Sequence, residues 1–81
     1  MNAMLESLRE LVLYSEERYL SMKEDIKKCL KKDTYESCIK AWDLEMESQK
    51  EYQRLTDYRH SLYYLRRALG HEVDIFHPEK F

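Results

Sequence analysis

The sequence predicts an all-α protein: an antiparallel helical hairpin with a short C-terminal tail. Its 81 residues include one glycine and one proline, whereas each hairpin turn of a β-sheet usually needs such residues. Apolar residues recur at steps of three and four over two long stretches, as they do on helix faces. One short run of capping residues separates the stretches. We therefore expect a helical hairpin domain at residues 1–70 and a tail at residues 71–81.

We expect the first helix at residues 4–32. The stretch lacks glycine and proline, and a heptad seam runs through it in which Ser15 is the only polar member. Lysines crowd its end, where positive charge complements the carbonyl end of the helix dipole. The seam residues are Leu5, Leu8, Val12, Ser15, Tyr19, Met22, Ile26 and Cys29.

We expect the second helix at residues 34–69. Asp33 or Thr34 can cap its start, Glu36 or Ser37 can complete a capping box, and Gly70 is a natural stop. Because the connection is short, we expect the two helices to run antiparallel. The apolar face of this second helix changes sides in the middle, by nearly half a turn. The first half has Tyr35, Ile39, Trp42 and Met46, and the second half has Leu55, Tyr58, Leu62, Leu65 and Leu69.

This change of face has two explanations. The helix breaks near Thr56–Asp57, or it stays continuous with one half on the first helix and the other half on a second subunit. No glycine or proline forces a break, so the sequence favours the continuous helix. Additional apolar residues on the first helix also need cover, which predicts a homodimer resembling a four-helix bundle. The expected self-association residues are Leu13, Leu20, Leu55, Tyr58, Leu62, Leu65 and Leu69.

Arginines and tyrosines gather near the end of the second helix, beside its leucine face. Arginine forks bind phosphate or carboxylate, and tyrosines stack and donate hydrogen bonds. Three interpretations stay open: a structural face whose arginines pair with Glu6 and Glu10 of the first helix, a contact for an acidic protein, or a site for RNA or a nucleotide. The candidate binding residues are Tyr52, Arg59, Tyr63, Arg66 and Arg67.

No constellation in the sequence predicts catalysis, and we expect no enzyme, no cofactor and no metal. There is no nucleophile with a base at useful spacing, no glycine-rich phosphate loop and no quartet of metal ligands. Asp57 and His60 lie one helical turn apart but lack the glutamates of a di-metal bundle. We expect Cys29 and Cys38 to be buried free thiols, with a disulfide or half of a zinc site as the alternatives.

Two further expectations concern Trp42 and the tail. We expect Trp42 to be a core aromatic under the hairpin turn, and the alternative is that it is an exposed contact for a partner. The tail has apolar residues between Val73 and Phe81, and Pro78 keeps its end from being helical. We expect the tail to fold back over its own subunit, with an extended docking segment as the alternative.

Taken together, these patterns predict a small non-catalytic protein–protein interaction module, an adaptor, regulator or inhibitor that acts as a self-associating helical hairpin. The partners expected are a second copy and another protein. The alternative is a dimer that binds a nucleic acid or nucleotide through the Arg/Tyr residues, although the net charge of −2 argues against a general polyanion binder. We expect a cytoplasmic protein that does not enter the membrane, because the chain has no long apolar run and no export signal at its start.

Overall fold

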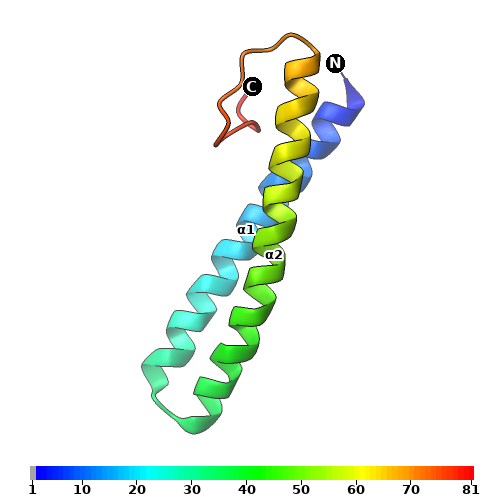
Figure 1. Ribbon diagram of the computed structural model, residues 1–81. Helices are drawn as coiled ribbons and strands as arrows, with labels where there is room; N and C mark the ends of the chain where they lie inside the picture. The colour runs from blue at the N-terminus through cyan, green and yellow to red at the C-terminus, as the bar shows by residue number, and fades with distance from the viewer. Residues whose placement is uncertain (1) are drawn as a thin grey trace.

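The computed structural model describes residues 2–81 and shows a helical hairpin (Figure 1). Helix α1 spans Ala3–Lys32 and helix α2 spans Tyr35–Ala68, and no strand occurs within residues 2–81. The two helices pack side by side in an elongated molecule of 52 × 19 × 15 Å. The predicted all-α hairpin is confirmed, and α2 is continuous through Thr56–Asp57 as the sequence favoured.

Local side chains define the start of each helix. The Asn2 Oδ1 atom accepts hydrogen bonds from the backbone N–H groups of Met4 (2.9 Å) and Leu5 (3.4 Å). Thr34 caps α2 in a capping box, because its hydroxyl accepts from the Ser37 N–H while the Ser37 hydroxyl accepts from the Thr34 N–H. Of the alternatives that the sequence left open, Thr34 and Ser37 are therefore the capping pair.

The chain reverses at the ends of the helices through two residues with positive φ. Asp33 (φ 51°) closes α1 in the left-handed conformation that Asp tolerates better than most residues. Gly70 (φ 83°) follows α2 in a Schellman motif. In this motif the Gly70 N–H donates to the Arg67 carbonyl, and the His71 N–H donates to the Arg66 carbonyl.

Two apolar clusters join the helices, and a polar stretch lies between them. Near the open end Leu5 and Val12 of α1 pack with Leu55 and Leu62 of α2, and Leu8, Tyr58 and Leu65 lie against them. Near the turn a smaller cluster contains Ile26, Cys29 and Ala41. Between them Ser15, Ser48 and Glu51 are buried. The predicted seam of α1 is confirmed, since its members face α2 over the whole length of the hairpin.

The face of α2 that contacts α1 does not change sides along the helix. In its first half this face consists of small or modest side chains at heptad spacing, Ser37, Ala41, Leu44 and Ser48. The large apolar residues of that half therefore point away from α1. The expectation that Trp42 is a core aromatic is wrong, because its side chain is 69% exposed.

Part of the expected self-association surface belongs to the core of the single chain. Leu55 and Leu62 are fully buried against α1, and Tyr58 and Leu65 pack on the same cluster. Their apolar surface is thus already covered within one subunit, which the sequence-based assignment of a subunit interface did not anticipate. Of that set, Leu13, Leu20 and Leu69 remain exposed.

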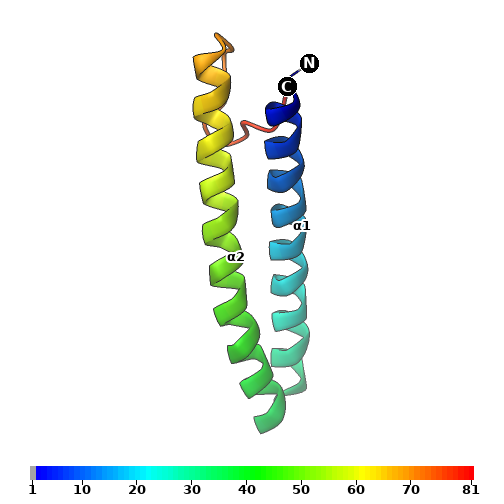
Figure 2. The ribbon, with the colours of Figure 1, turned by 90° about the vertical axis from the view of Figure 1, so that its right-hand side faces the viewer.

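The tail folds back on the hairpin at its open end. After Gly70 it leaves α2, turns, and crosses toward the first turns of α1 (Figure 2). Its Pro78 and Glu79 are buried, whereas Ile75 and Phe76 are exposed. Neither helix is long and apolar enough to cross a membrane, a finding that covers the described residues 2–81.

Candidate interaction surfaces

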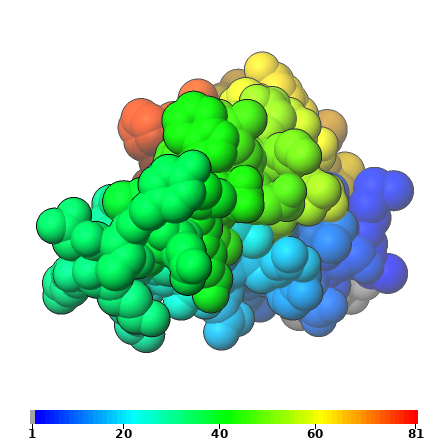
Figure 3. Space-filling model, turned by 90° about the horizontal axis from the view of Figure 1, so that it is seen from below, coloured from blue at the N-terminus to red at the C-terminus, as the bar shows by residue number. Residues whose placement is uncertain are grey.

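The first half of α2 has an apolar row with no partner in the chain. Tyr35, Ile39, Trp42 and Met46 follow one another at heptad spacing and are 80%, 46%, 69% and 46% exposed. We call these four residues the outer stripe. Seen from the turn end, the side chains of this half of α2 (green) form an open surface above α1 (Figure 3). The stripe covers three helical turns, so it offers a continuous apolar contact to another helix.

A shallow apolar groove borders the outer stripe near the turn. It is lined by Ile26 and Leu30 of α1 and by Cys38, Ala41, Trp42 and Glu45 of α2. Leu30 is 55% exposed, so the groove extends the apolar surface from α2 onto α1. An ion pair between Lys23 Nζ and Glu45 Oε2 (3.1 Å) joins the two helices beside it. The groove can therefore receive an apolar side chain from a molecule that packs on the stripe.

The Arg/Tyr residues near the end of α2 do not form one shared site. Tyr52 packs against Tyr19 of α1, with ring centroids 5.3 Å apart. The Tyr63 hydroxyl accepts a hydrogen bond from Arg67 Nη1 (3.2 Å), one helical turn away on the same helix. Tyr52 and Arg67 are exposed, but each lies against a neighbour within the hairpin.

Arg59 pairs with an acid of the opposite helix. Its Nη2 atom lies 3.6 Å from Oε2 of Glu16, and the side chain is 22% exposed. The interpretation that the arginines pair with acids of the first helix therefore holds for Arg59, but its partner is Glu16 rather than Glu6 or Glu10. Within the described residues, the buried Arg59 Nε atom has no hydrogen-bond partner.

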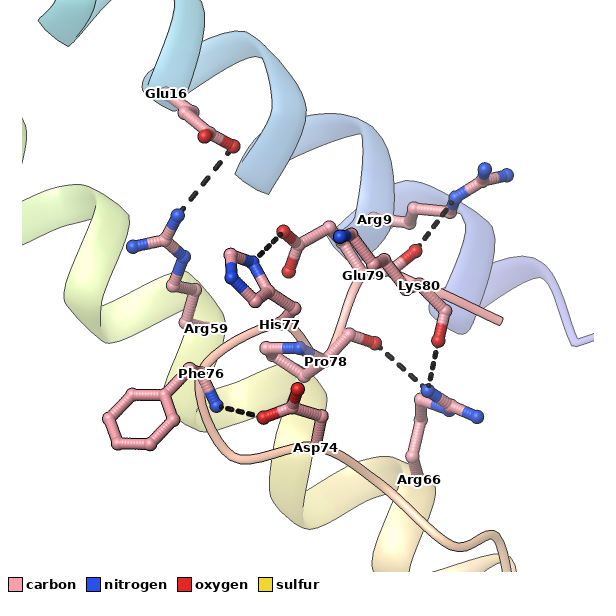
Figure 4. A network of polar contacts seen from close by, with 10 residues as sticks. All are labelled: Arg9, Glu16, Arg59, Arg66, Asp74, Phe76, His77, Pro78, Glu79 and Lys80. Atoms are coloured by element: carbon pink, nitrogen blue, oxygen red, sulfur yellow. Dashed lines mark hydrogen bonds and ion pairs between the residues drawn. The ribbon is translucent and has the colours of Figure 1, made fainter.

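Arg66 holds the C-terminal tail. Its Nη1 atom donates to the carbonyl oxygens of Pro78 (3.1 Å) and Lys80 (2.9 Å) (Figure 4). Its Nε atom donates to His71 Nδ1 (3.1 Å). The residue is only 7% exposed. A buried guanidinium requires such partners, because burial removes its hydration. The tail therefore supplies the hydrogen bonds that Arg66 would otherwise take from water.

Arg9 of α1 holds the tail from the other side. Its Nε atom donates to the Glu79 carbonyl oxygen (3.1 Å). Both guanidinium groups also contact the Phe81 ring, with Arg9 Cζ 5.0 Å and Arg66 Cζ 4.8 Å from its centroid. These are cation–π contacts within the usual 6 Å range. Three consecutive main-chain carbonyls and one aromatic ring are thus bound by two arginines from different helices.

The buried Glu79 side chain lies beside His77. The Glu79 carboxylate, 5% exposed, has Oε1 at 3.3 Å from His77 Nδ1. The other oxygen, Oε2, is buried and has no hydrogen-bond partner among residues 2–81. Sequence reasoning missed Arg9, Pro78 and Glu79, because no local pattern links the "HPEKF" segment to an arginine some 70 positions earlier.

The remaining polar candidates are isolated. Cys29 and Cys38 are both free thiols, but only Cys29 is buried, so the expectation of a buried thiol is wrong for the exposed Cys38. Residues 2–81 hold no group of three or more His, Cys, Asp or Glu side chains placed to bind a metal ion. On the surface of α1, Arg18 Nη1 donates to the Tyr14 hydroxyl (3.4 Å), and this bond together with the phenol charge raises the pKa of Arg18 further.

Comparison with known proteins gives no match: no protein-family model, no curated protein and no solved structure is significantly similar to the chain. The function is therefore inferred from the residues of the chain itself.

Proposed function

We propose that the protein is a small non-catalytic protein–protein interaction module that acts as a self-associating helical hairpin. The observation that supports this is the outer stripe, four large apolar side chains on a helix face that the hairpin leaves uncovered. Exposed apolar rows of this kind mark interaction surfaces in soluble proteins. A contact between the outer stripes of two copies would bury both and give an assembly of four helices.

The same surface suits an adaptor, regulator or inhibitor. Trp and Tyr are enriched among the residues that dominate binding energy at interfaces, and Met and Ile adapt to irregular apolar partners. Trp42 stands near the middle of the outer stripe and beside the groove that Leu30 and Cys38 line. A partner helix that packs on the stripe would therefore contact Trp42 first and most closely.

Binding of nucleic acid has less support than protein binding. Of the three arginines expected to contact phosphates, Arg66 is buried under the tail and Arg59 is paired with Glu16. Arg67 is left, and one exposed arginine beside a tyrosine gives little affinity for a polyanion. We therefore do not propose this alternative.

The proposal is tested by Trp42→Glu with Tyr64→Glu as the matched control. Tyr64 is also an exposed aromatic residue of α2, 68% exposed, but it lies outside the outer stripe. Light scattering coupled to size-exclusion chromatography should give a dimer mass for the unchanged chain and for Tyr64→Glu, and a monomer mass for Trp42→Glu. Circular dichroism checks that both variants stay helical. A monomeric unchanged chain, or a dimer that survives Trp42→Glu, would refute self-association through the stripe.

A further inference from the structure

The tail is bound at the open end of the hairpin through its main chain, as a peptide of a separate protein could be bound. Arg9 and Arg66 donate to the carbonyl oxygens of residues 78, 79 and 80, and residues 77–80 form a turn in which the Lys80 N–H donates to the His77 carbonyl (3.2 Å). Figure 4 shows these donors converging on the segment from α1 and from α2. We call the surface formed by Arg9 and Arg66 the tail-binding surface. It consists of side chains from both helices, so the folded hairpin forms it without the tail.

Two side chains of the tail give the contact its selectivity. Pro78 is fully buried, and its fixed φ suits the second position of the turn over residues 77–80, whose carbonyls the arginines bind. Phe81 places its ring against the guanidinium groups of Arg9 and Arg66. The Lys80 side chain is exposed, and only its carbonyl is used. The surface therefore recognises a proline followed three positions later by an aromatic residue.

The tail is an imperfect ligand for this surface. Glu79 Oε2 is buried in this contact and has no hydrogen-bond partner within residues 2–81. An unpartnered buried polar atom weakens a contact, because its hydration has been lost and not replaced. The connection back to α2 is exposed along most of its length, from Gly70 to Phe76. Release of the tail thus frees the guanidinium groups of Arg9 and Arg66.

We propose that the tail-binding surface is a peptide-docking site, held by the tail in the free protein and taken by a turn-forming segment of a partner protein with the pattern proline, two residues, aromatic. The carbonyl contacts and the Phe81 contact define the chemistry of that segment. The tail competes with that segment from within the chain. The apparent affinity for the partner segment is therefore the intrinsic affinity multiplied by the fraction of molecules in which the tail is released. This site is separate from the outer stripe, and neither depends on the other.

The experiment titrates a fluorescent synthetic peptide of residues 71–81 into the full chain and follows its anisotropy. Phe81→Ala in the chain removes the tail's anchor and leaves the arginines intact. The peptide should bind this variant about tenfold more tightly than the unchanged chain, because the internal competitor is weakened. Adding Arg9→Gln or Arg66→Gln to the Phe81→Ala chain should abolish binding. Arg9→Gln changes a partly exposed residue of α1, so it serves if the Arg66 variant misfolds.

Changes within the peptide give a control that does not involve folding. A peptide with Phe81→Ala should not bind, whereas a peptide with Lys80→Ala should bind as the original does. Equal affinity for the unchanged and Phe81→Ala chains, or binding that survives loss of Arg9 and Arg66, would overturn the proposal. A dimer of the unchanged chain that Trp42→Glu leaves intact and Arg66→Gln abolishes would also overturn it, because the occupant would then be the tail of a second copy.

Discussion

Arg66 shows how the sequence can single out one side chain without indicating what that side chain binds. Its place beside Tyr63 and Arg59 in the sequence suggests an exposed anion-binding row. In the folded chain the guanidinium is buried and bonded to main-chain carbonyls of the tail. The spacing of residues along a helix predicts which side of the helix a residue occupies. It does not predict that a segment with no regular structure will cover that side.

The leucines at the open end allow a direct test of whether they belong to one chain or to an interface. Leu62 is fully buried in the cluster with Leu5, Val12 and Leu55. Leu62→Ala should lower the free energy of unfolding by about 3 kcal/mol, the usual loss for a buried leucine. Urea denaturation measures this, and the loss should be the same at low and high protein concentration.

The control for Leu62 is Leu69→Ala, which truncates a leucine that is 47% exposed at the end of α2. Its effect should stay within about 0.5 kcal/mol, as for most surface substitutions. If the Leu62→Ala loss shrank at low protein concentration, where a dimer dissociates, the residue would lie between subunits instead of between α1 and α2.

At the scale of the helices, most of the hairpin follows from local rules. The heptad seam of α1, the capping residues Thr34 and Ser37 and the stop at Gly70 are all readable from the sequence and are present in the structure. The face of α2 that meets α1 is the exception. Its first half has small or polar residues such as Ser37 and Ser48, which a search for apolar residues passes over. The residues of the outer stripe are more apolar, so the sequence pattern indicates them instead as the apolar face of this half.

The polar middle of the hairpin should limit its stability. Glu51 is 3% exposed at its side chain and pairs with Arg54, which is 58% exposed (Nη1 to Oε2, 3.0 Å). Removing one member of a buried ion pair is costly when the other charge stays buried, but Arg54 is exposed, so replacing Glu51 leaves no buried charge behind. Glu51→Leu would extend the apolar cluster of Leu55 by one helical turn toward Ser48, and we expect the free energy of unfolding to rise by about 1 kcal/mol.

Glu47→Leu is the matched control for Glu51→Leu. Glu47 also pairs with a basic residue three positions later, Lys50, but both side chains are more than half exposed. The control should change the free energy of unfolding by no more than about 0.5 kcal/mol in urea denaturation. A fall in stability with Glu51→Leu would mean that the Glu51 carboxylate stabilises the middle of the hairpin.

At the scale of the whole molecule, two helices cover too little of their own apolar surface. A pair of helices has one contact face, and residues such as Leu20 of α1 and Trp42 of α2 lie on other faces. The sequence indicates this excess, since it has apolar residues outside both seams. It does not indicate which leucines are covered within the chain, because that depends on which face of α2 contacts α1, and the first half of this face has small or polar residues.

Trp42 is the single tryptophan of the chain, so its emission reports directly on the outer stripe. If two copies meet through the stripe, the indole passes from water into an apolar contact. We expect the emission maximum to shift to shorter wavelength as protein concentration rises through the dissociation range. Because only folded chains dimerise, the urea midpoint should also rise with protein concentration. At a protein concentration a hundred times the dissociation constant, dimerisation stabilises the folded chain by about 2.7 kcal/mol.

The tail provides the control for this concentration series. Phe81→Ala weakens the tail contact at the open end of the hairpin and leaves the outer stripe unchanged. The variant should show the same concentration-dependent shift in emission as the unchanged chain. An emission maximum and a urea midpoint that both stay constant up to millimolar protein would show that the stripe does not bind a second copy. The exposed face of α2 would then be available to a different protein alone.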